Sequence, residues 1–169
     1  MNFKAIINQL LTEHKITVVK WSKSSCGRAC VDKRLIKIPK PTNIDRFCVC
    51  LHEIGHIVKQ ATKRKMKLYQ SEFLAESYVF EIAEKLQIDV SSYKERARRY
   101  VIMNIAKGYC RGLNLNTINP EVKKFCDIDF SAWEGKKVFV KNWGSKSYTK
   151  PLEIEFGILN AIIANAVPT

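Results

Sequence analysis

Residues 45–59, DRFCVCLHEIGHIVK, decide the fold, because this stretch combines helical spacing of apolar residues with two histidines four positions apart. The run from Phe47 to Leu51 and the pair after the second histidine are apolar, as expected of a helix with a buried face. Thr42 or Asn43 can cap the beginning of this helix. The stretch therefore predicts a helix that is largely buried around its histidines.

His52, Glu53 and His56 form an HExxH pattern within this helix. Residues four apart lie one turn apart on the same face, so both imidazoles can reach one metal ion. Zinc binds neutral imidazole nitrogen in tetrahedral geometry and, in catalytic sites, keeps one position for water. Glu53 lies beside His52 and can act as general base on that water. The pattern predicts a zinc-dependent hydrolase (Zn²⁺ as cofactor), with cleavage of peptide bonds as its reaction.

Two further details favour a real metal site over a chance match on an exposed helix. The chain has 3 histidines, and two of them fall in the pattern. Gly55 costs the helix about 1 kcal/mol relative to alanine, so its presence predicts that a strand or a substrate approaches closely there.

A third ligand is needed, and the best candidates are two glutamates one helix later. Glu72 and Glu76 are four residues apart and share a helix face, so one can bind the metal while the other supports the site. Glu76 is the first choice and Glu72 the second. His14 is expected to cap the first helix or to face solvent, and Glu81 and Glu84 are expected to be solvated or to pair with a neighbouring helix.

The remaining elements follow from hydrophobic periodicity. The predicted helices are Phe3–Leu11, Ser71–Leu86, Ser92–Tyr109 (opened by a capping box) and Leu152–Ala166, and the predicted strands are Ile16–Trp21, Leu35–Ile38 and Val138–Val140. Ser22–Lys33 has the composition of a turn. This order predicts one α+β domain over residues 1–169 with a small antiparallel sheet, a core at about 16–88 and a C-terminal extension at about 113–169.

Charge and cysteine content bear on partners and compartment. The net charge of +13 favours acidic partners such as nucleic acid or a nucleic-acid-bound protein. The longest apolar stretch, Phe156–Val167, is too short to span a bilayer, and no signal peptide is recognisable, so a cytoplasmic protein without a membrane partner is expected. The spacings Cys26/Cys30 and Cys48/Cys50 do not match zinc knuckles, so buried free thiols are expected, with a second zinc site as the alternative.

The surroundings of the motif resemble a known family. The features that carry the resemblance are Ile36–Pro39, then Leu51–His56, then a helix with Ala75, Glu76 and Phe80. This order is similar to the ImmA/IrrE-type metallopeptidases and to the related zincin domain of ArdC-type antirestriction proteins. The resemblance covers roughly Ile16 to Ile88, under half of the chain.

The resemblance implies a zincin-like fold in which His52, His56 and Glu76 bind zinc, as in gluzincin-like sites, and Glu53 is the catalytic glutamate. Members of this family are cytoplasmic and often encoded by phages, plasmids or stress-response loci, and some cleave DNA-binding repressors. The chain departs from the pattern after Glu76, where Ser77-Tyr78 stands in place of the frequent Ala-Asn. No helix-turn-helix or sensor domain is recognisable after Leu113.

Two classes of function follow from these patterns. The first is a zinc metallopeptidase acting on a protein or peptide substrate, one that is itself associated with nucleic acid. The second is a basic nucleic-acid-binding or phage/plasmid accessory protein on a zincin fold, favoured by dispersed Lys and Arg and by Trp133, Trp143 and Tyr148. A factor delivered between cells is a third and weaker alternative. For the peptidase, Tyr69, Tyr109 and Tyr148 are candidates to stabilise the oxyanion.

Overall fold

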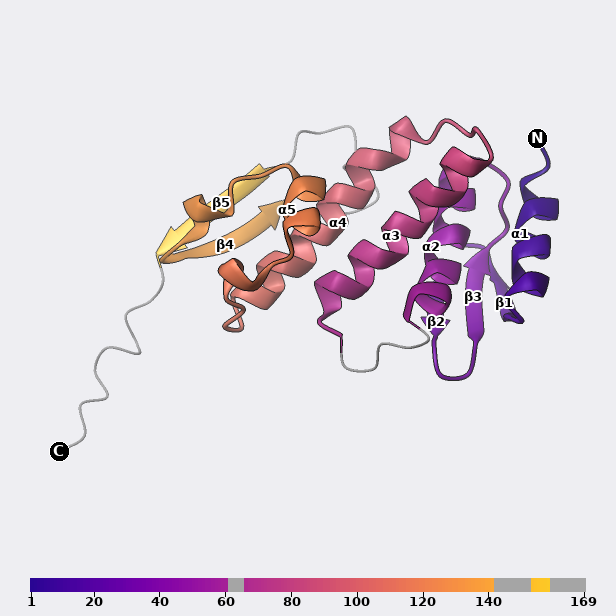
Figure 1. Ribbon diagram of the computed structural model, residues 1–169, viewed down its shortest axis with the longest axis horizontal. Helices are drawn as coiled ribbons and strands as arrows, with labels where there is room; N and C mark the ends of the chain where they lie inside the picture. The colour runs from indigo at the N-terminus through magenta and orange to yellow at the C-terminus, as the bar shows by residue number, and fades with distance from the viewer. Residues whose placement is uncertain (61–65, 142–152, 159–169) are drawn as a thin grey trace. The chain divides into compact units, whose positions relative to one another are not determined.

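The computed structural model describes residues 1–60, 66–141 and 153–158 (Figure 1). Its helices and its two small sheets confirm the predicted α+β class. The chain divides into two compact units, residues 1–97 and 98–169, and the predicted core of about 16–88 lies inside the first. The boundary between the units falls within helix α4 (Ser91–Tyr109).

The first unit contains the predicted motif helix and its neighbours. Its elements are α1 (Phe3–Glu13), β1 (Thr17–Ser22), β2 (Arg28–Cys30), β3 (Leu35–Pro39), α2 (Ile44–Gln60), α3 (Leu68–Lys85) and the first turns of α4. Asn43 caps α2 as predicted, because its Oδ1 accepts a hydrogen bond from the Arg46 N–H at 3.0 Å. The start of α4 differs from the prediction: Asp89, not Ser92, accepts the hydrogen bond of the first turn, from the Ser91 N–H at 2.8 Å.

The sheet of the first unit is mixed, with the order β1-β3-β2. β1 pairs with β3 in parallel and β2 pairs with β3 antiparallel, so the predicted antiparallel sheet is wrong for the first of these pairings. β2 lies within Ser22–Lys33, which was predicted as a turn, because three residues are too few for a period of two to be recognised. β3 takes the centre, where Ile36 and Ile38 are fully buried.

Helix α2 packs on strands β2 and β3 and also on helix α3 (Figure 1). The two helices approach each other closely at Gly55, where a Cβ atom would lie 2.8 Å from the Ala75 carbonyl oxygen and 3.0 Å from the Tyr78 Cβ. The close approach predicted at Gly55 is therefore made by a helix and not by a strand or a substrate. This glycine sets the distance between the two helices that carry the candidate site.

Replacing Gly55 with alanine is expected to destabilise the protein, although alanine is the better helix former by about 1 kcal/mol. The new methyl group would meet backbone atoms of Ala75, which cannot rotate away, and overpacking of this kind costs about 1–3 kcal/mol. Urea unfolding measures the change. The control is Gly108→Ala in α4, whose methyl group would meet only the Leu113 side chain, with its nearest atom at 3.1 Å. Equal stability of the two variants would contradict the argument.

The second unit is built around the end of α4. Its other elements are the short 3-10 helices η1 (Leu115–Thr117) and η2 (Phe130–Trp133), α5 (Pro120–Cys126), β4 (Lys136–Lys141) and β5 (Glu153–Ile158). The fully buried Trp133 packs edge-on against Phe130, and its carbonyl accepts a hydrogen bond from the Tyr109 hydroxyl at 2.8 Å.

Strands β4 and β5 can be compared with the strand and the helix that were expected near the C-terminal end of the sequence. The predicted strand Val138–Val140 is confirmed as part of β4. The predicted helix Leu152–Ala166 is wrong over Glu153–Ile158, which forms β5 and pairs antiparallel with β4. Residues 159–166 lie outside the described residues. The alternation of Glu153 and Glu155 with apolar residues is the period-two signal of a strand with one exposed face.

Candidate metal centre

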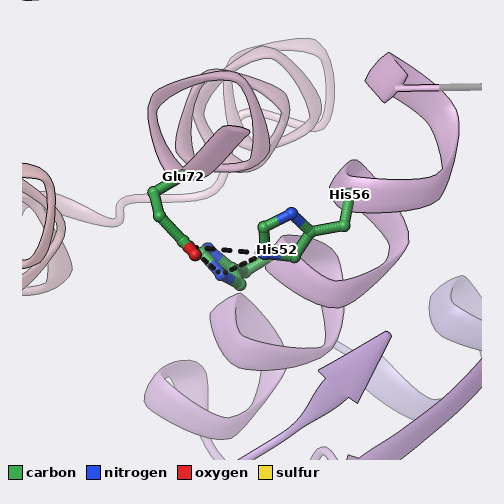
Figure 2. A group of neighbouring side chains, drawn as sticks. All are labelled: His52, His56 and Glu72. Carbon is green, nitrogen blue, oxygen red and sulfur yellow. Dashed lines mark hydrogen bonds and ion pairs between the residues drawn. The ribbon is translucent and has the colours of Figure 1, made fainter. Parts of the chain in front are cut away.

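Two histidines of α2 and one glutamate of α3 converge on one point (Figure 2). The two Nε2 atoms of His52 and His56 lie 3.0 Å apart. Glu72 Oε2 lies 3.2 Å from His52 Nε2 and 3.3 Å from His56 Nε2. His52 and Glu72 are buried, and His56 is nearly so. In the part of the chain that the structure describes, no other group of His, Cys, Asp and Glu brings its ligand atoms together in this way.

The three atoms form a nearly equilateral triangle, which suits one face of a tetrahedral metal site. Bonds of about 2.0–2.1 Å at tetrahedral angles place neighbouring zinc ligands roughly 3.3–3.4 Å apart, close to the separations seen here. Glu72 Oε2 is also buried and faces the two Nε2 atoms. A buried carboxylate oxygen of this kind is costly unless a cation or donor faces it. The group could therefore hold a metal ion.

Further side chains of α3 and α4 hold the two imidazole rings from their other sides. Glu76 Oε1 lies 3.0 Å from His52 Nδ1, and Ser71 Oγ lies 3.3 Å from His56 Nδ1. The buried Tyr93 hydroxyl donates a hydrogen bond to Glu76 Oε1 at 3.3 Å. A partner at Nδ1 leaves Nε2 of each ring as the ligand atom, which is the usual way in which proteins orient a metal-binding histidine.

Glu53 lies beside this triangle with its side chain buried between α2 and the loop before β2. Gly27 of that loop lies close to Glu53, since a Cβ atom there would lie 2.7 Å from the Glu53 carboxyl carbon. Only glycine leaves room for the carboxylate in this position. The loop thus fixes where the Glu53 side chain can lie, 7% exposed, next to the two histidines.

The charges of the site influence one another strongly. Burial raises the pKa of Glu53, the two imidazoles oppose this rise, and the carboxylates of Glu72 and Glu76 reinforce it. Burial alone would lower the pKa of His52, but the neighbouring carboxylates, Glu76 first, raise it well above its usual value. Burial acts to raise the pKa of Glu72, but the contacts with His52 and His56 outweigh this effect and lower that pKa to about 2. The two imidazoles therefore stabilise the ionised form of Glu72.

The structure separates the roles of the five residues singled out in the sequence. His52, His56 and Glu72 converge, and Glu53 lies beside them. Glu76 reaches the far side of the His52 ring and does not join the triangle. The geometry therefore favours Glu72, the second choice, over Glu76 as the third ligand. Glu72 could not be preferred from sequence, because both glutamates lie on the same face of α3.

Four other residues considered in the sequence are His14, Glu81, Tyr109 and Tyr148. His14 ends α1, and its Nε2 lies 3.2 Å from the Tyr78 hydroxyl, so it takes no part in the triangle. Glu81 is exposed and accepts hydrogen bonds from Lys59 of α2, which confirms the expected helix-pairing charge. Tyr109 lies in the second unit, bonded to Trp133 as described above, and Tyr148 lies outside the described residues.

The cysteines only partly follow the expectation of buried thiols. The buried cysteines are Cys48, Cys50 and Cys126, and the exposed ones are Cys26, Cys30 and Cys110; none of the six forms a disulfide. Cys48 and Cys50 lie in α2 as predicted, and burial raises the pKa of each thiol to about 12. Such thiols stay protonated at neutral pH and pack as small apolar side chains.

No helix among the described residues is long and apolar enough to cross a membrane. Comparisons of the chain with protein-family models, with curated proteins and with solved structures found no match.

Proposed function

We propose that the protein is a zinc-dependent metallopeptidase whose metal ligands are His52, His56 and Glu72. The observation that carries this proposal is the triangle of two Nε2 atoms and one buried carboxylate oxygen, on the helix that also carries the buried Glu53. Two imidazoles and a carboxylate, with one position left for water, are a donor set that catalytic zinc sites use. Zinc suits imidazole nitrogen better than Mg²⁺ or Ca²⁺ does.

A bound zinc ion would lower the pKa of a coordinated water and polarise a carbonyl group. The chain's own residues supply the proton transfer and the orientation. Glu53 is the proton acceptor, and the raised pKa that its burial causes brings it closer to neutral pH, where a general base works best. Glu76 and Tyr93 hold the His52 ring in the orientation that presents Nε2.

A peptide is the proposed substrate because of the strand beside the site. β2 is an edge strand of its sheet, it packs on α2, and the loop before it touches Glu53. An extended peptide can add to such an edge through backbone hydrogen bonds, which would place its carbonyl groups near Glu53. The resemblance to ImmA/IrrE-type enzymes agrees with this substrate class and with a target that is associated with nucleic acid.

Removal of the metal tests the proposal. Treatment with a strong chelator, followed by its removal, should reduce hydrolysis of a mixed fluorogenic peptide library to background. One equivalent of Zn²⁺ should restore the activity, and Mg²⁺ should not, because Mg²⁺ prefers oxygen ligands. Metal analysis of each sample serves as the control. Undiminished hydrolysis by protein that holds less than about a tenth of an equivalent of metal would contradict the proposal, since His52, His56 and Glu72 would then have no catalytic ion to hold.

A further inference from the structure

A second candidate site lies in the second unit, lined by residues of α4, of the turn after it and of β4. It is a cleft of about 370 Å³ with an apolar floor and a cationic rim. Met103, Ala106 and Val138 form the floor and are almost fully buried. The volume falls within the range of small-molecule sites and is large enough for one nucleotide unit.

The rim of the cleft is positively charged. Lys107 of α4, Arg111 in the turn that follows α4, and Lys137 of β4 line the cleft, and all three are exposed. Among the described residues that line the cleft, none is acidic. The acidic residue opposite Phe139 on β5, Glu155, pairs with Lys141 beyond the cleft. Three cations among the described lining residues favour an anionic ligand, and phosphate groups suit both Lys and Arg.

The same rim carries an exposed aromatic ring. Phe139 of β4 is 46% exposed although it is a large apolar residue, and the Lys137 ammonium group lies 5.3 Å from the centre of its ring. An exposed ring beside cations is the combination with which proteins bind single-stranded nucleic acid, because a base stacks on the ring while the cations contact phosphates.

We propose that the α4–β4 cleft binds single-stranded nucleic acid, with one base stacked on Phe139 and the flanking phosphates at Lys107, Arg111 and Lys137. This inference goes beyond the peptidase and does not depend on it, because none of these residues belongs to the metal centre. A peptidase with such a site would be held close to substrates that are bound to the same nucleic acid.

Fluorescence anisotropy with a labelled ten-nucleotide oligothymidylate tests the site, using metal-free protein of full length. We expect binding that weakens with salt, with a slope of log K against log salt of about −2 for three phosphate contacts on a single strand. Phe139→Ala should weaken binding roughly tenfold or more, the usual effect of losing one stacked base. Arg111→Gln should weaken binding and reduce the salt slope by about 0.7.

The protein provides matched controls for both changes. Phe156 is as exposed as Phe139 and also lies beneath a lysine, Lys136, but it does not line the cleft, so Phe156→Ala should leave binding unchanged. Lys124 is exposed on α5, and Lys124→Gln should have less effect than Arg111→Gln. Phe139→Trp should retain binding, which separates lost stacking from lost folding.

Several outcomes would overturn the proposal. These are no binding at low salt, equal effects of Phe139→Ala and Phe156→Ala, or equal affinity for a duplex of the same length, whose bases are already stacked inside. Competition by thymidine monophosphate as strong as that by the oligonucleotide would also overturn it, since the cleft would then take a free nucleotide and not a strand.

Discussion

Glu53→Gln is expected to reduce peptide hydrolysis by roughly 10²–10⁴-fold while the bound zinc is retained, as is usual when a general base is removed. Glutamine has the same size as glutamate and can occupy the same space beside Gly27, but its amide cannot accept the proton. The variant should be at least as stable as the wild type, because burial disfavours the charged form of Glu53 and the amide removes this cost.

Three measurements decide this prediction: hydrolysis of the peptide library, zinc content, and thermal unfolding of the metal-loaded protein. The control is Glu84→Gln on α3, which removes an exposed carboxylate of the same helix that carries Glu72 and should leave all three measurements unchanged. If Glu53→Gln kept full activity, Glu53 would not be the general base. Loss of zinc in this variant would instead make Glu53 a ligand.

The motif helix is the part of the fold that the sequence predicts best. A run of apolar residues at helical spacing, an asparagine cap and two histidines four apart all point to the same structure, and α2 agrees with each. The contacts within this helix are local, so the relative positions of His52 and His56 follow from helical geometry alone. This is why their convergence could be predicted without knowledge of the tertiary fold.

The sheet could not be predicted in the same way, because its pairing depends on contacts distant in sequence. β2 has only three residues, and β3 is the centre of the sheet although it comes last along the chain. Periodicity identifies the faces of a strand and not its neighbours. For β5, by contrast, residues 153–158 carry the alternation of a strand, and the apolar run that follows them in the sequence favours a helix.

The sequence also cannot decide which of the two glutamates of α3 is the third metal ligand. Glu72 and Glu76 share one face of the helix, so either could point toward α2. The selection depends on how far α3 is shifted along α2, and the close contact of Gly55 with Ala75 sets this shift. Sequence reasoning therefore narrows the third ligand to two residues, and packing favours one of them.

Paired substitutions of these glutamates test the assignment. Glu72→Gln is expected to lower the affinity for zinc by more than about 100-fold, beyond the 10–100-fold that is typical when a residue supporting a ligand is changed. Glu76→Gln should fall within that smaller range, because its amide can still contact the His52 ring while the carboxylate charge is lost. Competition with a chromophoric zinc chelator measures both affinities, and Glu84→Gln, an exposed position of the same helix, is the control.

The test is which of the two substitutions weakens zinc binding more, since any change near a metal site can weaken binding to some extent. If Glu76→Gln abolished zinc binding and Glu72→Gln preserved it, Glu76 would be the third ligand and His52 would bind through Nδ1, the atom that Glu76 faces. The buried oxygen of Glu72, which faces both Nε2 atoms, would then have no metal ion beside it. The free energy of burying the Glu72 carboxylate therefore favours Glu72 as the third ligand, because a metal ion between Glu72 and the two Nε2 atoms removes the cost of burying it.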